Sequence, residues 1–151
     1  MKTRKTLIVF VFVLLLTTIS FIFANSLETV SESSAKGESV MNAVLPGLEM
    51  FLGKGNVTDH LVRKIAHFVE FGALGVELML LGILRRKVNY QNISNCLFFG
   101  LASAVIDESL QMLTDRSPLV KDILLDFSGV VTGVLFVLLL NCIVKSVRKH
   151  S

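Results

Sequence analysis

The sequence predicts an all-α, polytopic membrane protein, a bundle of four transmembrane helices with both termini in the cytoplasm. Two observations predict this fold class. Of the 151 residues, 52% are hydrophobic and only 18% are charged, with a mean hydropathy of +0.69, whereas about 25% of the residues in a soluble domain are charged. The chain also contains four apolar runs, each near the ~20 residues that a helix needs to cross a bilayer.

The first apolar run follows three basic residues and is uncharged over residues 7–24. A signal peptide also begins in this way, but its apolar core spans only about 7–15 residues. We therefore expect an uncleaved first transmembrane helix, residues 1–24. Residues 25–59 would form an extracytoplasmic connection. Within it, apolar residues at helical spacing over 40–52 indicate a helix that caps the bundle or lies in the membrane interface.

The other three apolar runs make up a predicted three-helix core, residues 60–144. Thr58 or Asp59 is a suitable N-cap for its first helix, which should end near residue 84. After the core, residues 145–151 form a basic tail that we place in the cytoplasm.

The last two core helices have start signals of their own. Asn92 or Ser94 is a suitable N-cap for the third span, which should run to about residue 113. A polar turn follows. Ser117 then Pro118 is typical of an N-cap and a first helical position, where proline is well tolerated. The fourth span should begin there and end near residue 144.

Basic residues predict the orientation of these spans. Three lie in each of three clusters, at 2–5, 85–87 and 145–149, so the clusters hold nine of the 15 lysines and arginines. Lysine and arginine favour the cytoplasmic side of a membrane, so both termini should be cytoplasmic. Because the basic residues mostly flank apolar runs, the net charge of +3 does not indicate a nucleic-acid partner.

Ionisable residues inside apolar runs are costly and therefore indicate a functional site. In the predicted topology they share the outer half of the bundle, at the start of the second span, the end of the third, and the start of the fourth. Glu77 lies deeper, and both a structural and a functional role stay open for it. The residues of the outer half are Lys64, His67, Glu70, Asp107, Glu108, Gln111, Arg116, Asp122 and Asp126.

Helical spacing brings several of these residues onto common faces. His67 lies three residues from both Lys64 and Glu70, while Asp107 and Gln111 are four apart. Glu108 is offset to the side of that second pair.

The fourth span carries a narrow stripe with two carboxylates followed by two small residues. Asp122, Asp126, Gly129 and Gly133 recur at intervals of three or four. Glycines at this spacing let another helix approach closely. Such an approach would bring the carboxylates of the stripe against the face that carries His67.

Two kinds of chemistry fit this set of residues, beside a purely structural ion network. In the first, acid–base catalysis uses His67, Glu70, Asp107, Glu108 and Asp126. Substrate binding or charge pairing then falls to Lys64, Gln111, Arg116 and Asp122. In the second, His67 and Glu70 face one divalent metal ion, and Asp107, Asp122 or Asp126 completes an oxygen-rich shell. Because no complete metal-ligand motif is present, the sequence assigns no metal and no cofactor.

These residues lie in three blocks through which the chain resembles the VanZ-like family of bacterial membrane proteins, named for a teicoplanin-resistance determinant. The blocks are R-K-I-A-H-F-V-E-F-G-A-L-G at 63–75, D-E-S-L-Q at 107–111, and D-R-S-P-L-V-K-D-I-L-L-D-F-S-G at 115–129. Leu110 replaces a polar residue that is frequent in the family, and Asp115 replaces a frequent glycine. These departures bear on substrate preference more than on the core of the site.

The resemblance implies a multi-pass protein of the bacterial cytoplasmic membrane, and some members of the family are linked to glycopeptide tolerance. Two hypotheses remain. In one, an outward-facing enzyme uses His67 with Glu70 or Asp126 on an envelope lipid, a glycan or a lipoglycopeptide. In the other, a non-catalytic binding or assembly protein uses its charged network to hold the bundle together. Under both hypotheses, the lipid bilayer surrounds the protein and is its expected partner.

Overall fold

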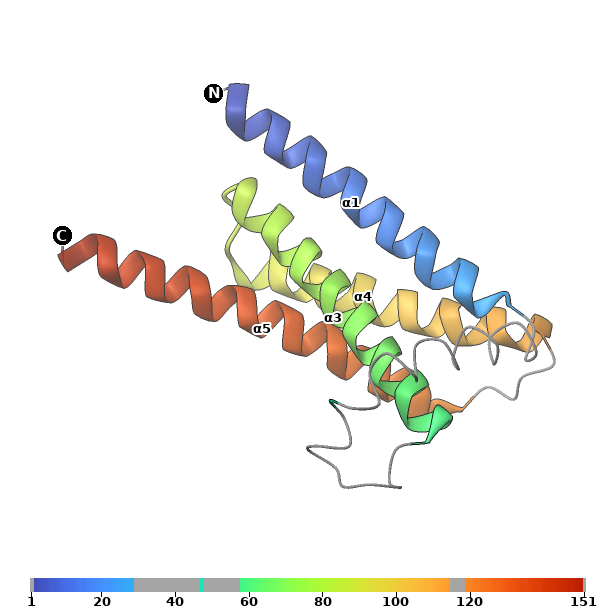
Figure 1. The fold of residues 1–151 in the computed structure, drawn as a ribbon. Coiled ribbons are helices and arrows are strands. Elements are labelled where there is room, and N and C mark those ends of the chain that lie inside the picture. The colour runs from blue at the N-terminus through green and yellow to red at the C-terminus, as the bar shows by residue number, and fades with distance from the viewer. Residues whose placement is uncertain (1, 29–46, 48–57, 115–118, 151) are drawn as a thin grey trace.

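The computed structural model describes residues 2–28, 47, 58–114 and 119–150 (Figure 1), and the regular elements of this part of the chain are helical. They are α1 (Lys2–Ser26), α3 (Asp59–Leu84), α4 (Tyr90–Gln111), the short 3₁₀ helix η1 (Met112–Thr114) and α5 (Val120–His150). Four of these helices are long and apolar enough to cross a membrane. The predicted all-α class with four spans is therefore confirmed.

The bundle has two distinct ends. Figure 1 shows both termini and the turn between α3 and α4 at one end, which we call the basic end. There, Arg4 Nε donates a hydrogen bond to the Leu84 carbonyl oxygen at 2.6 Å, which joins the start of α1 to the end of α3. The opposite end, which we call the polar end, contains the last turns of α1 and α4 and the first turns of α3 and α5.

The observed caps match the sequence prediction for α3 but not for α4. The Thr58 hydroxyl accepts a hydrogen bond from the Leu61 N–H at 3.2 Å and caps α3. In α4 the N-cap is Asn89, whose side chain accepts from the Asn92 N–H at 2.9 Å. The predicted caps Asn92 and Ser94 were wrong, because Asn89 supplies the acceptor earlier in the chain.

The last helix is longer than the sequence predicted. It continues to His150 instead of ending near residue 144, because the polar residues beyond the apolar run include good helix formers such as Lys145, Arg148 and Lys149. Its predicted start at Ser117 and Pro118, like nearly all of the predicted helix over 40–52, lies outside the described residues.

The most extensive helix contact joins α3 to α5, and backbone proximity explains it. A Cβ atom at Gly129 would lie 2.5 Å from the Phe68 carbonyl oxygen, and Cβ atoms at Gly75 and Gly133 would be closer still to the carbonyl oxygens of Val130 and Gly72. Only glycine lets the two backbones come this near. We call Gly72, Gly75, Gly129 and Gly133 the glycine seam.

The buried core surrounds this seam, while much of the outer helix surface is apolar and exposed. Phe71 and Leu74 of α3 pack with Val130 and Val134 of α5, all at most 1% exposed. By contrast, α1 leaves large side chains such as Phe10 uncovered. An apolar surface of this kind suits contact with lipid, where helices are held together by close packing.

Candidate functional site

The first turns of α3 supply one wall of the site. Lys64 and His67 lie one helical turn apart near its start. The Lys64 ammonium pairs with Asp122 Oδ1 of α5 at 3.0 Å, and both side chains keep partial exposure, 34% and 27%. This pair links the starts of the two helices at the rim of the polar end.

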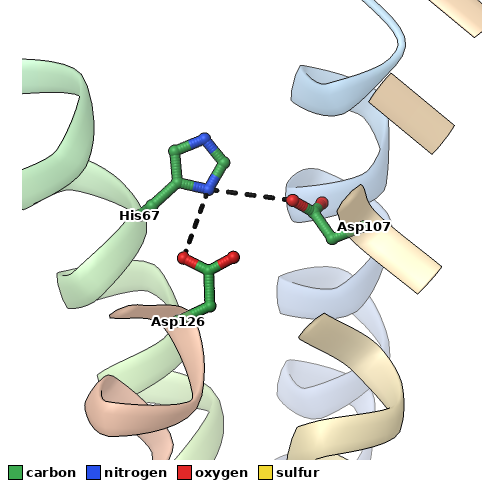
Figure 2. A group of neighbouring side chains, drawn as sticks. All are labelled: His67, Asp107 and Asp126. Atoms are coloured by element: carbon green, nitrogen blue, oxygen red, sulfur yellow. Dashed lines mark ion pairs between the residues drawn. The ribbon is translucent and has the colours of Figure 1, made fainter. Parts of the chain in front are cut away.

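His67 lies where three helices meet. Its Nδ1 atom is 3.8 Å from Asp107 Oδ2 of α4 and 3.8 Å from Asp126 Oδ1 of α5 (Figure 2). The two aspartates are buried, and the histidine side chain is 18% exposed. Figure 2 also shows the second ring nitrogen pointing away from both carboxylates. We call His67, Asp107 and Asp126 the His67 group.

Hydrogen bonds from Ser26 and Gln111 help to hold Asp107 in place. The buried Ser26 hydroxyl at the end of α1 donates to Asp107 Oδ1 at 2.5 Å, and the Gln111 amide donates to Asp107 Oδ2 at 3.2 Å. The first helix therefore contributes to the site, which the sequence argument missed. The available signal was the pair of polar residues Asn25 and Ser26 directly after the first apolar run.

Glu108 is buried beside the group and has a structural contact. Its Oε1 atom accepts a hydrogen bond at 2.6 Å from the backbone N–H of Leu119, the residue before α5 begins. The first N–H groups of a helix have no partner within the helix. A carboxylate from α4 therefore stabilises the start of α5, which carries Asp122 and Asp126.

Glu70 and Glu77 face α1. Asn25 donates a hydrogen bond to Glu70 Oε1 at 3.5 Å, and Thr18 donates one to Glu77 Oε1 at 2.8 Å. Glu77 is 6% exposed and lies two turns deeper than Glu70. Although the sequence argument paired Glu70 with His67, Glu70 is not among the residues whose ligand atoms converge within 4.8 Å of one another; those are the members of the His67 group.

A cavity of about 260 Å³ opens beside the His67 group. Basic side chains, carboxylates and two leucines line it, so a ligand there would meet both charges and an apolar surface. The lining residues are His60, Arg63, Lys64, His67, Glu108, Gln111, Leu119, Asp122, Leu125 and Asp126.

The structure thus gathers most of the predicted site residues at the polar end. Glu70 contacts α1 through Asn25, and Gly129 and Gly133 form part of the glycine seam. Arg116, predicted to bind or pair charges, lies outside the described residues. Sequence reasoning missed Ser26, Asn25 and Leu119 as direct partners of the site carboxylates.

The fold and the site together define a multi-pass helical membrane protein with a buried cluster of ionisable residues. The sequence model of the VanZ/LLP1 family matches residues 8–141, a range that holds all three members of the His67 group. The chain belongs to the VanZ/LLP1 family, as the sequence blocks predicted. Neither the comparison with curated proteins nor the one with solved structures gave a match.

Proposed function

We propose that this VanZ/LLP1-family protein is an outward-facing enzyme of the bacterial cytoplasmic membrane. It performs acid–base chemistry on an envelope lipid, a glycan or a lipoglycopeptide and thereby contributes to teicoplanin tolerance. The observation that carries the proposal is the His67 group, a histidine beside two buried carboxylates from two other helices. Ionisable groups at membrane depth are costly and mark functional sites.

The chemistry follows from the arrangement of the imidazole. Asp107 and Asp126 both lie on the Nδ1 side of His67, and the other ring nitrogen points away from them. A carboxylate at one nitrogen orients the ring and stabilises the charge that forms when the other nitrogen takes a proton. The 3.8 Å separations exceed a hydrogen bond, but such contacts are often long before substrate binds.

The lining of the cavity supports the proposed kind of substrate. Arg63, Lys64 and His60 line it together with Leu119 and Leu125. Guanidinium and ammonium groups bind phosphate and carboxylate strongly, and the leucines would contact an apolar chain. An anionic, lipid-linked headgroup fits this combination.

The outward orientation rests on the basic clusters. Arg85, Arg86 and Lys87 belong to the turn between α3 and α4, which lies at the same end of the bundle as both termini, and lysine and arginine favour the cytoplasm. Alkaline phosphatase fused after Lys54 should be active, because the enzyme folds outside, and a fusion after Lys87 should be inactive. The reverse pattern would place the cavity in the cytoplasm and contradict an outward-facing site.

A second candidate function is non-catalytic binding or assembly. It is favoured by the contacts of Glu108 with the Leu119 N–H and of Lys64 with Asp122, which join helices without implying chemistry. In that case the charged network holds the bundle and presents the cavity to a ligand.

The two candidates are separated by a His67→Gln variant, which keeps hydrogen bonding and bulk but loses the titration of imidazole. Asp126→Asn is its companion, and Ser128→Ala on the exposed side of α5 is the control. Envelope lipids and added teicoplanin would be compared by mass spectrometry, with teicoplanin susceptibility measured at matched membrane levels of the protein.

If the protein is an enzyme, wild type and Ser128→Ala should chemically alter a lipid or the drug. His67→Gln and Asp126→Asn should insert and fold but leave both lipid and drug unaltered. Full activity of folded His67→Gln would contradict the catalytic proposal. Tolerance without any chemical change in lipid or drug would favour the binding protein.

A further inference from the structure

The two carboxylates of the His67 group are almost completely buried. Asp107 and Asp126 are 0% and 1% exposed. Buried charges are normally paired or bound to a metal. Within the described part of the chain, Asp126 Oδ1 has no hydrogen-bond partner, and Figure 2 shows this oxygen directed at His67 Nδ1. The group therefore converges on a point that suits a cation.

The distances in the group are close to those of a metal site. One nitrogen of His67 and one oxygen from each aspartate all lie within 4.8 Å of one another, and both nitrogen–oxygen separations are 3.8 Å. With metal–ligand bonds of about 2.0–2.2 Å in a tetrahedral arrangement, ligand atoms are roughly 3.3 Å apart. Small side-chain rotations would bring all three atoms into contact with one ion.

Asp107 is also supported in the way that metal ligands are. Hydrogen bonds from Ser26 and Gln111 fix both of its oxygens. Outer partners of this kind orient ligating side chains and raise metal affinity. Ser26 comes from α1 and Asp107 from α4, so the packing of these two helices would preset the ligand.

We propose that His67 Nδ1, Asp107 and Asp126 bind one divalent metal ion. The donors are one imidazole and two carboxylates, a set that suits zinc or manganese better than magnesium or calcium, which prefer oxygen alone. Two carboxylates balance the charge of the ion. Three protein ligands leave further coordination positions open, as in catalytic sites, and the neighbouring cavity gives a phosphate or carboxylate access to them.

This inference rests on the proposed function and gives the same site a cofactor, with His67 as a metal ligand in place of the proton carrier proposed above. It also competes with a simpler arrangement, in which a protonated His67 pairs with both carboxylates. The two arrangements differ in a measurable way. A metal ion that binds only the folded protein stabilises it more as the metal concentration rises, with the logarithm of that concentration, whereas an ion pair does not respond to a chelator.

The test uses the full chain, purified in detergent with an affinity tag that contains no histidine. Metal content is measured by mass spectrometry, and thermal unfolding is followed after chelation and during return of zinc or manganese. We expect about one ion per chain and a melting temperature that falls on chelation and recovers with the metal. His67→Gln, Asp107→Asn and Asp126→Asn should lose the ion.

The matched controls are His60→Gln and Asp122→Asn, which remove the same groups from the cavity rim and should keep the ion. Ser26→Ala should keep the fold and weaken affinity by about 10–100-fold. Metal bound equally by every variant, or a melting temperature that ignores chelator and added metal, would overturn the proposal. Bound metal without any envelope phenotype would refute the proposed enzyme and leave the metal site standing. If the purified protein held no metal but the envelope phenotype still required His67, the metal site would be refuted and the proposed enzyme would stand.

Discussion

The glycine seam and the His67 group belong to the same pair of helices but differ in what holds them. In the seam, the backbones of α3 and α5 touch so closely that Gly75, Gly129 and Gly133 have no room for a methyl group. At the polar end, the same helices are separated by side chains, with His67 3.8 Å from Asp126 and a cavity alongside. Packing dominates the first region and charge the second.

This difference teaches where stability and function reside. Gly129 follows Asp126 by one turn and contacts the carbonyl of Phe68, the residue after His67. The seam therefore sets the distance at which His67 and Asp126 face each other. We expect the seam to carry most of the stability, while the polar end uses that rigidity to hold charges that do not stabilise the fold by themselves.

The largest expected effect comes from filling the seam. Alanine at Gly75 or Gly133 would place Cβ against a backbone carbonyl oxygen, and the helices would have to move apart. Overpacking of this kind costs about 1–3 kcal/mol. Thermal unfolding in detergent should show a lower melting temperature for both variants, with less folded protein in the membrane.

Gly72→Ala is the matched control within the seam. Among the described residues outside its own helix turn, its Cβ would meet only the Gly129 carbonyl oxygen at 3.7 Å, an ordinary contact. Since alanine favours a helix over glycine by about 1 kcal/mol, this variant should be as stable as wild type or slightly more so. A Gly72→Ala loss as large as that of Gly133→Ala would show that the seam is not what limits the packing.

A smaller effect is expected at the rim of the polar end. Lys64 and Asp122 are paired at 3.0 Å but about a third exposed, and such pairs contribute about 0–1 kcal/mol. Lys64→Met should therefore lower the unfolding free energy by less than about 1 kcal/mol, as measured by chemical denaturation in detergent. A loss comparable to that of the seam variants would mean that the rim pair is a main support of the bundle.

The smallest effect is expected at Glu77. Its single described hydrogen bond comes from Thr18, and the amide oxygen of a glutamine can accept the same bond. Glu77→Gln should change the unfolding free energy by less than about 1 kcal/mol and leave the envelope phenotype intact. If this variant instead matched Asp126→Asn in loss of function, the functional site would have to extend along α1 into the bundle.

Much of the fold could be predicted from the sequence because bilayer length and capping are local properties. The four spans and the Thr58 cap follow from runs of residues close together in the chain. The same locality produced the errors. Asn89 precedes the predicted caps of α4, and α5 continues past its apolar run to His150, since helix formation there depends on propensity and not on hydropathy.

The site was predicted in part, for a physical reason. Spacing on one helix indicated that Lys64 and His67 share a face, and topology indicated which helix ends meet. Neither spacing nor topology could give the rotation of one helix relative to another. The bonds from Ser26 to Asp107 and from Asn25 to Glu70 join residues 81 and 45 positions apart, so only the packed bundle reveals that α1 contacts both carboxylates.

The most direct test of the central claim compares variants of the glycine seam with a variant of the His67 group. For each variant, function is measured against the amount of folded protein. Teicoplanin tolerance, or the envelope lipid profile, would be plotted against folded membrane protein for Gly133→Ala, Gly72→Ala, Asp126→Asn and wild type. We predict that Gly72→Ala lies on one line with wild type, because it changes only how much protein folds, and that Gly133→Ala, which also moves α3 and α5 apart, lies slightly below that line. Asp126→Asn should fall far below that line at near wild-type abundance. If Asp126→Asn lay on the same line, the polar end would be a structural network and the proposed site would be wrong.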